Sequence, residues 1–335
     1  MSTREFILYV SSFLLVSQLA SAQTQWVNFN DETATRLSLS ATDTLEKDIA
    51  VGDLNKDGWD DIVVVRKLPF SNPGPRQDIL LLNENGVLVD RTSQFAPGFI
   101  ANPTDSRDVF LGDFTGDGWL DVVIANTFED QPRFYRNRGN DVSGNWLGLI
   151  DESSTRLPTL SVPTDLSTVQ FCAVSGGDVT GNGALDIYFS NYTPTGGTND
   201  ILLINNGSGM FTNETAARLG TRANVAFGTS VEIRDVDNDG DNDIVKISTL
   251  YSASPFPIGQ FILFNDGAGV FTTIPFQAVS TAKPYMFTVG DLNKDGKLDH
   301  YIVDDDQDRV AIAQSVVAGS VTYTTTVLPT SPRTD

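Results

Sequence analysis

Asp53-Leu-Asn-Lys-Asp-Gly-Trp-Asp-Asp61 is the first of five copies of one nine-residue pattern in this chain of 335 residues. The pattern has Asp at positions one and nine, an oxygen-bearing side chain at positions three and five, and Gly at position six. The other copies are Asp113-Phe-Thr-Gly-Asp-Gly-Trp-Leu-Asp121, Asp178-Val-Thr-Gly-Asn-Gly-Ala-Leu-Asp186, Asp235-Val-Asp-Asn-Asp-Gly-Asp-Asn-Asp243 and Asp291-Leu-Asn-Lys-Asp-Gly-Lys-Leu-Asp299. Their first residues are 60, 65, 57 and 56 residues apart. Such a regular interval indicates a repeat fold.

Short apolar segments surround each copy in the same order. One predicted strand leads into the pattern and a β-branched strand leaves it. A third strand follows a variable linker, and a turn rich in Asn and Gly opens a fourth, as in Asn205-Asn-Gly-Ser-Gly-Met-Phe211 and Asn265-Asp-Gly-Ala-Gly-Val-Phe271. The predicted strands are 48–52, 108–112 and 285–290 before the pattern, 61–65, 121–125, 186–190 and 243–247 after it, 78–82, 133–136, 200–204 and 260–264 in third place, and 309–313 with 321–327 in the last repeat. Four short strands per repeat, with almost no helical periodicity, are typical of a β-propeller blade.

The Gly52–Val64 unit, the Asn205–Phe211 hairpin and the tail Asn213-Glu-Thr-Ala-Ala-Arg-Leu219 resemble the FG-GAP/VCBS repeat family. This repeat occurs in the propeller of the integrin α-chain and in many secreted bacterial proteins. The resemblance covers about residues 26–330 and implies an all-β propeller of four-stranded blades over 23–335. The implied repeats are about 48–98, 108–160, 171–220, 228–280 and 285–328.

The number of blades is less well defined than their type. Propellers of this family usually have seven blades, whereas five are visible here. Residues 29–37 match the tail at 211–219, so we expect 26–40 to form the outer closing strand of a last blade. The fifth repeat also brings its own third and fourth strands. An incomplete seven-bladed ring, present as a fragment or an open arc, is therefore favoured, and a closed five-bladed ring is the alternative.

Oxygen ligands at alternate positions with Gly at the sixth position indicate a calcium loop. In the first copy Asp53, Asn55 and Asp57 offer side-chain oxygens, Trp59 offers its backbone carbonyl, and Asp61 closes the site. Up to five Ca²⁺ ions are predicted in this way. The remaining predicted ligands are Asp113, Thr115, Asp117, Trp119 and Asp121; Asp178, Thr180, Asn182, Ala184 and Asp186; Asp235, Asp237, Asp239, Asp241 and Asp243; and Asp291, Asn293, Asp295, Lys297 and Asp299.

An EF-hand is excluded because its loop needs a bidentate Glu at position twelve. Those positions here are Val64, Ile124, Phe189, Lys246 and Ile302. The number of carboxylates ranks the predicted sites, with the fourth loop tightest and the third weakest. Packing between blades is favoured over ligand stacking for the indoles that follow the loop glycines, Trp59 and Trp119.

The charge of the chain fits bound cations. The 43 acidic and 22 basic residues give a net charge of -21, which argues against nucleic acid and anionic membranes as partners. Fifteen of the acids are Asp residues at positions one, three, five and nine of the five loops. Five bound Ca²⁺ ions would carry ten positive charges and reduce the net charge to about -11.

The first 22 residues are predicted to form a secretory signal peptide. Arg4 precedes the apolar stretch 6–16, and Ala20-Ser-Ala22 supplies the small residues of a cleavage site. An N-terminal membrane anchor is the alternative, but the stretch is short and interrupted by serines. We therefore expect an exported protein, extracellular, at the cell surface or in a periplasm, without membrane insertion after cleavage.

No catalytic residue is assigned. His300 is the only His and Cys172 the only Cys, so neither a zinc cluster nor an internal disulfide can form. A structural role is favoured for His300 and burial for Cys172. Whether the chain is an enzyme is left open, with a non-enzymatic module favoured.

The linkers between second and third strands vary most and emerge opposite the calcium loops. Their aromatic residues Phe70, Tyr192, Tyr251 and Phe256 could stack on sugars or pack on a partner, or simply cover blade edges. The favoured function is a secreted calcium-binding module of the adhesion type for a glycan or an extracellular protein. The alternatives are a polysaccharide lyase or hydrolase on the same scaffold and a structural segment of a larger exported protein.

Overall fold

The computed structural model describes residues 30–39, 45–68, 74–128, 131–160, 170–192, 198–304 and 307–329. The chain divides into two compact units, residues 1–37 and residues 38–335. The predicted signal peptide, residues 1–22, and Phe70 lie outside the described residues. No helix in the described ranges is both long and apolar enough to cross a membrane.

The described part of the first unit differs from the strand predicted over 26–40. It contains helix α2 (Thr33–Arg36), and the two-residue strand β1 (Leu37–Ser38) runs across the unit boundary. The carboxylate of Asp31 accepts a hydrogen bond from the amide of Thr33 at 3.0 Å, and the Glu32 carbonyl accepts from the amide of Arg36. These local bonds favour a helical turn, so the strand prediction is wrong over residues 33–36.

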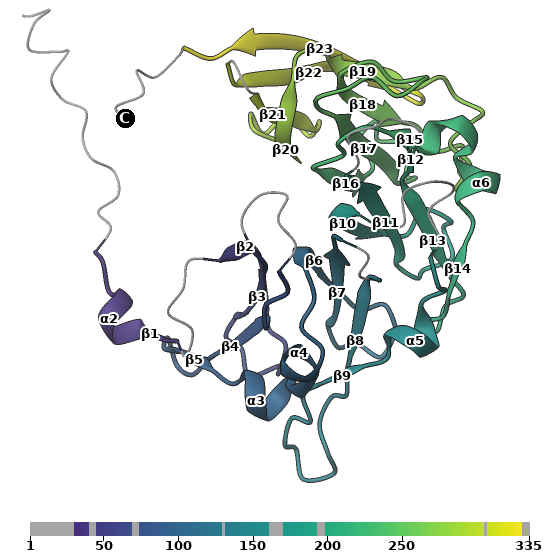
Figure 1. Ribbon diagram of the computed structural model, residues 1–335. Helices are drawn as coiled ribbons and strands as arrows, with labels where there is room; N and C mark the ends of the chain where they lie inside the picture. Colours follow the sequence, from purple (N-terminus) through teal and green to yellow (C-terminus); the bar gives the residue numbers. More distant parts are fainter. Residues whose placement is uncertain are drawn as a thin grey trace, which may run out of the picture. The chain divides into compact units, whose positions relative to one another are not determined.

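The second unit contains five antiparallel sheets of the repeat type, numbered here in chain order (Figure 1). Four of them have four strands, and in sheet 1 the short strand β1 pairs with β5 as a fifth. Sheet 1 has β2 (Glu46–Gly52), β3 (Asp61–Arg66), β4 (Ile79–Asn83) and β5 (Leu88–Asp90), and sheet 2 has β6 (Ser106–Gly112), β7 (Asp121–Asn126), β8 (Arg133–Asn137) and β9 (Leu149–Asp151). Sheet 3 has β10 (Phe171–Gly177), β11 (Asp186–Asn191), β13 (Ile201–Asn205) and β14 (Phe211–Asn213), and sheet 4 has β16 (Val231–Arg234), β17 (Asp243–Ser248), β18 (Gly259–Leu263) and β19 (Gln277–Ser280). Sheet 5 has β20 (Pro284–Gly290), β21 (Asp299–Asp304), β22 (Arg309–Val317) and β23 (Ser320–Val327).

The predicted first, second and third strands are confirmed to within one or two residues at nearly every end. One fourth strand is displaced. Phe271 was expected to open it, but β19 begins only at Gln277. The amide of Phe271 instead donates to the carbonyl of Arg218 in the preceding repeat, and its ring is buried. The segment is therefore used to join two repeats before the strand begins.

Short helical turns follow several of the fourth strands. These are α3 (Thr92–Phe95), α4 (Pro97–Ala101), α5 (Ser153–Arg156), α6 (Thr215–Arg218) and the 3-10 turn η1 (Gly220–Ala223), while β12 (Thr198–Asn199) pairs with β15 (Asn224–Val225). In α6 the hydroxyl of Thr215 donates to Asn213 Oδ1 at 2.7 Å and accepts from the amide of Leu202 at 2.9 Å. Thr92 and Ser153 make the corresponding bonds in α3 and α5. In α3, α5 and α6 one hydroxyl thus ties the turn to the third strand of its own sheet.

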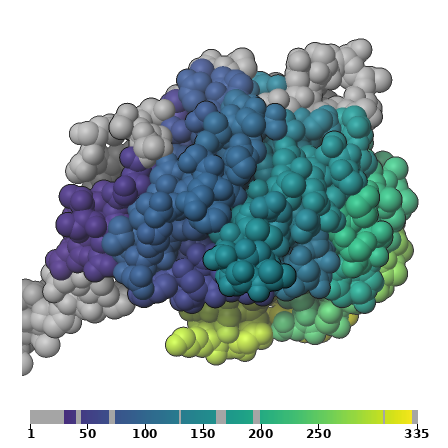
Figure 2. Space-filling model, turned by 90° about the horizontal axis from the view of Figure 1, so that it is seen from below, coloured from purple at the N-terminus to yellow at the C-terminus, as the bar shows by residue number. Residues whose placement is uncertain are grey.

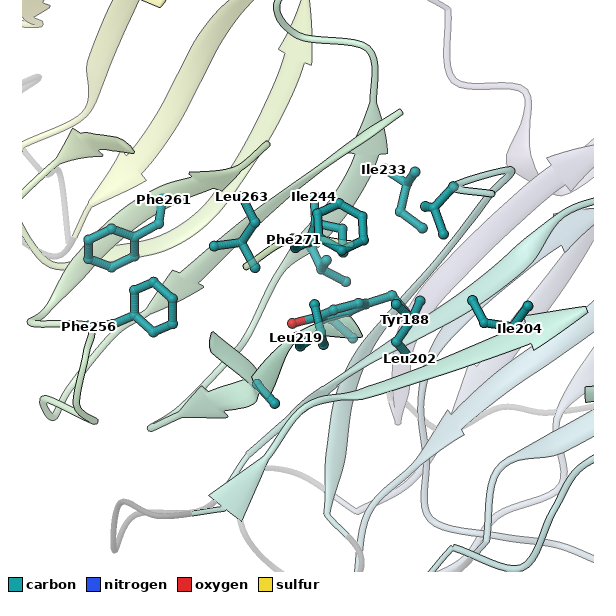
Figure 3. Packing of buried hydrophobic residues seen from close by; sticks show 14 residues of the cluster. Tyr188, Leu202, Ile204, Leu219, Ile233, Ile244, Phe256, Phe261, Leu263 and Phe271 are labelled. Atoms are coloured by element: carbon teal, nitrogen blue, oxygen red, sulfur yellow. The ribbon is translucent and has the colours of Figure 1, made fainter. Parts of the chain in front are cut away.

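Each hydrophobic core lies between two consecutive sheets. One cluster combines Tyr188 and Leu202 of sheet 3 with Ile233, Ile244 and Leu263 of sheet 4 (Figure 3). Comparable clusters join sheets 1 and 2, sheets 2 and 3, and sheets 4 and 5. The blue and teal surfaces of the first two sheets adjoin in the space-filling view (Figure 2). A single sheet therefore cannot bury its apolar faces without a neighbour.

The first strands also meet in chain order, β2 with β6, β6 with β10, β10 with β16 and β16 with β20. The described residues form five successive sheets and no closed ring. The all-β architecture of four-stranded repeats is confirmed, whereas the complete number of blades stays a prediction.

Candidate metal centres

The five nine-residue patterns fold into five loops of the same geometry, each joining the first and second strands of one sheet; we call them loops 1 to 5. In loop 1 the carboxylate of Asp53 accepts the amides of Asp57 at 3.1 Å and Gly58 at 3.0 Å, and Asp57 Oδ1 accepts the amide of Trp59 at 2.9 Å. The same bonds recur in the other loops, starting from Asp113, Asp178, Asp235 and Asp291. This network turns the backbone around the side chains of positions one, three and five.

Two positions of each loop have a left-handed backbone. Position six is Gly throughout, with φ of 91° at Gly58 and 99° at Gly240. Position four also has positive φ, and there loops 1, 4 and 5 have Lys56 at 57°, Asn238 at 57° and Lys294 at 64°. Non-glycine residues adopt this conformation at a cost of about 1–2 kcal/mol. The loop therefore holds its shape against the preference of these residues.

The closing Asp of each loop has a structural role that the sequence did not reveal. Asp61 is fully buried, and its carboxylate accepts the amides of Leu54 at 3.0 Å and Asn83 at 2.9 Å. It thereby joins the start of the loop to the end of the third strand. Asp121, Asp186, Asp243 and Asp299 make the equivalent pairs of bonds. Each carboxylate oxygen has a second lone pair, so this role leaves capacity for a cation.

Burial opposes the charge of these closing carboxylates. It raises the pKa of Asp61 to about 6 and that of Asp121 to about 7, although the accepted amide bonds partly offset the effect. The pKa of Asp243 is raised to about 8, because Asp237 and Asp239 add repulsion to the effect of burial. A cation beside such groups would favour their ionised form.

Loop 4 has the most concentrated negative charge. Carboxylate oxygens of Asp235, Asp237 and Asp239 lie within 4.8 Å of one another. Asp237 is buried and also accepts the backbone amide of Gly319 from the last hairpin of sheet 5. Three converging carboxylates around one point form the donor set that Ca²⁺ prefers.

The remaining loops mix carboxylates with neutral oxygens at position three. Asn55 and Asn293 accept the amides of Asp57 and Asp295 at 2.9 Å. Thr115 in loop 2 has a buried hydroxyl oxygen without a hydrogen-bond partner in the described part of the chain. An orphaned oxygen at a predicted ligand position fits a bound cation.

Loop 5 contains a cation of its own. The Lys297 ammonium lies 2.8 Å from Oδ2 of Asp295, a predicted ligand. This bond lowers the pKa of Asp295, and the ammonium would compete with a metal for that oxygen. The loops therefore fit calcium chemically but differ in charge.

The two indoles that follow loop glycines have different surroundings. The ammonium of Lys56 in sheet 1 lies 4.4 Å from the centroid of the Trp119 ring in sheet 2. The packing role predicted for Trp119 is thus present in the structure. Trp59, by contrast, is 44% exposed.

His300 and Cys172 are interior residues, as the sequence indicated. The His300 ring lies between the Gln260 amide at 3.1 Å and the Tyr323 hydroxyl at 2.9 Å. Burial lowers its pKa to about 3, so it stays neutral at physiological pH. Cys172 is buried against the guanidinium of Arg107, at 3.2 Å from its Nε. Both side chains serve packing.

A row of aromatic rings lies at the other end of sheets 3 and 4. Tyr192 follows the last residue of β11 and Tyr251 lies just beyond β17, whereas loops 3 and 4 precede these strands. Phe227 links them, with ring centroids 4.5 Å from Tyr192 and 5.5 Å from Tyr251. The Arg107 guanidinium lies 6.0 Å from the centroid of the Tyr192 ring.

The sequence identified only part of this row. Phe227 and Arg107 were missed, because neither lies in a variable linker. For Phe256 the sequence left open ligand contact or a covering role, and the structure favours the covering role, because it is 1% exposed and belongs to the core between sheets 3 and 4. Its ring packs against Phe261 and lies 4.8 Å from the ammonium of buried Lys246, which explains its burial.

The fold and the loops define a repeat protein in which each four-stranded antiparallel sheet has an acidic loop between its first two strands. The family model described as FG-GAP-like repeat matches residues 53–124, 113–189 and 178–245, which together cover more than half of the chain. This chain belongs to the FG-GAP-like repeat family, and the resemblance drawn from the sequence is confirmed.

A comparison with solved structures finds a likeness to the crystal structure of the V. cholerae biofilm matrix protein Bap1. The identity is 15% and the TM-score 0.41, and the match covers 85% of this chain and 41% of that chain. This chain thus spans about two fifths of the length of Bap1, and a likeness at this level decides nothing about function. No curated protein matches the chain.

Proposed function

We propose that this chain is an exported binding module of the adhesion type, stabilised by Ca²⁺ in its five loops. Its ligand is a glycan or an extracellular protein, bound at the end of the sheets opposite the loops. The location is extracellular, at a cell surface or in a periplasm. Family membership and the two ends of the sheets support this proposal.

The observation that carries the calcium part is the three-carboxylate cluster of Asp235, Asp237 and Asp239 within 4.8 Å. Three negative charges at this separation repel one another strongly without a cation. Ca²⁺ would bind these oxygens and the carbonyl of Asp241, and it would supply charge neutralisation rather than chemistry. Its role is thus to hold neighbouring strands together.

The aromatic row supports the binding part. Tyr251 is 50% exposed, Tyr192 is half-buried, and the guanidinium of Arg107 adds a charged donor beside them. Exposed tyrosines combine a flat apolar face with a polar edge, which suits both sugar rings and protein side chains. A rigid scaffold below them limits the entropy lost on binding.

Calorimetric titration with Ca²⁺ tests the metal assignment. We expect saturable uptake, the tightest binding at loop 4, and a loss of melting temperature in EDTA. Absence of both uptake and any change in melting temperature would contradict calcium as a structural partner.

Screening of glycan and extracellular-protein arrays tests the binding assignment. We expect Tyr251→Ala and Tyr192→Ala to lose the signal, and Met210→Ala, an exposed apolar residue 39% accessible in the loop-end hairpin of sheet 3, to keep it. Equal signals from all three variants would show that the aromatic row is not the binding surface. The His300 environment favours no catalytic alternative.

A further inference from the structure

The residue after the first Asp of each loop packs against the next sheet. Leu54, Phe114, Val179 and Val236 are each at most 1% exposed and belong to the four inter-sheet cores. The equivalent residue of sheet 5, Leu292, is 52% exposed. Sheet 5 therefore presents, uncovered, the face that every other sheet buries against its successor.

The complementary face lies on the first strand of each sheet. Val109, Val174, Val231 and Phe287 occupy the same place in β6, β10, β16 and β20, and their exposure is 6%, 5%, 6% and 7%. Their equivalent in β2, Ile49, is 55% exposed, as is Val51 beside it. Sheet 1 thus leaves open the face that receives a preceding sheet.

The two open faces match in sequence as well as in apolar character. Lys56 of loop 1 lies over Trp119 of sheet 2 at 4.4 Å. Asp291-Leu-Asn-Lys-Asp-Gly296 in loop 5 repeats the residues of loop 1 from Asp53 to Gly58, so Lys294 is the counterpart of Lys56. Trp59 is the counterpart of Trp119, and it is 44% exposed.

Polar contacts between first strands occur in two registers, one for Asp48 and Asp108 in sheets 1 and 2 and the other for Ser175 and Glu232 in sheets 3 and 4. The open faces of sheets 5 and 1 have residues that fit the second register. Asp108 accepts the amide of Val174 at 2.7 Å, and in later sheets Ser175 accepts that of Ile233 at 3.1 Å and Glu232 that of Val289 at 3.2 Å. Thr288 is the exposed residue of sheet 5 at the place of Ser175 and Glu232. Val51 is at the place of Ile233 and Val289.

We propose that two copies of this chain associate head to tail, with sheet 5 of one copy packing on sheet 1 of the other. Leu292 and Lys294 of one copy contact Ile49, Val51 and Trp59 of the second, and the Thr288 hydroxyl accepts the amide of Val51. Its apolar and cation–π contacts reproduce those between sheets 1 and 2 of a single chain, and its polar bond reproduces those between sheets 3 and 4 and between sheets 4 and 5.

We assign a second copy of this chain as the partner because every copy has both of the complementary faces, the open face of sheet 5 and the open face of sheet 1. Within one chain the two faces do not cover each other, since Ile49 and Leu292 are both exposed. The contact is heterologous, so it leaves one open face at each end and can be extended by further copies. This inference does not depend on the ligand or metal of the proposed function.

Sedimentation velocity over a wide range of concentrations tests the proposal. The wild-type chain is expected to self-associate with rising concentration, and Trp59 fluorescence to shift in parallel. Ile49→Lys removes one face and Leu292→Lys the other, so each variant alone is expected to remain monomeric, with a Kd weakened more than about tenfold. An equimolar mixture of the two variants keeps one intact pair of faces, and it is expected to form dimers and nothing larger.

Two further variants guard against misfolding and surface effects. Val303→Lys, on the same side of sheet 5 with 39% exposure, is expected to reproduce the loss. Val142→Lys, fully exposed in the connection between β8 and β9, is expected to associate as the wild type does. A wild-type chain that stays monomeric at every concentration overturns the proposal. This holds regardless of whether a closed ring or further blades cover the faces of sheets 1 and 5. So does a mixture of variants that fails to form dimers.

Discussion

Lys297 shows how one side chain can set apart loops of equal geometry. Its ammonium binds Asp295 at 2.8 Å, at a position held by Trp, Ala or Asp in the other loops. We predict that Lys297→Gln raises the calcium affinity of loop 5 by roughly a few-fold, because the competing charge is partly exposed to solvent and its attraction is therefore screened. Calorimetry measures the change, with Lys283→Gln, outside every loop, as the control. An unchanged affinity would mean that the ion pair between Lys297 and Asp295 does not compete measurably with calcium binding.

The carboxylates of loop 4 permit a matched pair of substitutions. Asp237→Asn removes one of three converging charges and is expected to weaken the tightest calcium site by more than about tenfold. Asp241→Asn removes the same charge from a residue expected to contribute only its carbonyl, so it is expected to have a much smaller effect. Calorimetric titration of both variants distinguishes the ligand from its neighbour. Equal losses of calcium affinity in the two variants would mean that the overall negative charge of the loop, and not specific ligation by Asp237, binds the ion.

Asp78 is a fully buried acid outside the loops, beside a cavity of about 440 Å³ that Arg66 and Thr92 also line. Burial raises its pKa to about 7, against bonds from the Ser106 hydroxyl and the Arg66 amide. The folded state thus binds a proton that the unfolded state has released above pH 4. The contribution of protonated Asp78 to the free energy of unfolding is complete below about pH 4, and it is lost as the pH rises towards 7.

Asp78→Asn tests this linkage. The difference in unfolding free energy between wild type and variant is expected to fall by something on the order of a few kcal/mol from pH 4 to pH 7. Urea denaturation at several pH values measures it, and Asp60→Asn, an exposed acid, is the control. A difference that stays constant with pH would show that Asp78 is ionised throughout.

Among the elements, the helical turns depend on a single hydroxyl. Thr215→Val keeps the shape of the side chain but leaves the Leu202 amide without its acceptor at a buried position. We expect a loss of about 1–3 kcal/mol in unfolding free energy, measured by denaturant titration. Thr212→Val, on the exposed strand β14, is the control and is expected to change stability little. A loss no larger than that of the control would mean that water replaces the hydroxyl.

The sequence predicted strands far better than turns, for physical reasons. The β-branched runs after each loop, such as Asp61–Arg66, must form strands because they are covered on both faces. The four-residue helical turns are too short for a helical period, and they form through side-chain bonds such as that of Asp31 to Thr33. Phe271 likewise follows a contact with a neighbouring repeat, which no local pattern encodes.

The sequence located all five loops, whereas their occupation by calcium stays a prediction and one part of their role was missed. Spacing alone identified all five loops, since their geometry is local. It could not show that Asp61 and its equivalents also fasten the third strand, because Asn83 lies 22 residues further along the chain. The arrangement of the aromatic row is equally non-local, which is why Phe227 was missed.

For the whole molecule, removal of metal is expected to lower stability more than a single site would suggest. The seventeen Asp carboxylates of the five loops, in a chain of net charge -21, then repel one another. We predict that EDTA lowers the melting temperature by at least a few degrees, and by more at low salt, where screening is weakest. Differential scanning calorimetry measures the shift. Ca²⁺ is expected to restore it and Mg²⁺ to restore less, because these loops offer flexible oxygen ligands.

The sharing of every core between two consecutive sheets also sets an order of events during synthesis. The apolar residues of sheet 1, such as Leu80, remain uncovered until the strand containing Val109 has left the ribosome or the export channel. Each later sheet then completes the core of the one before it and exposes a new half-core of its own. Such nearest-neighbour growth keeps contacts local in sequence and allows structure to propagate along the chain. The most recently formed sheet of the nascent chain accordingly always has an exposed apolar face. A chaperone would protect that face from aggregation.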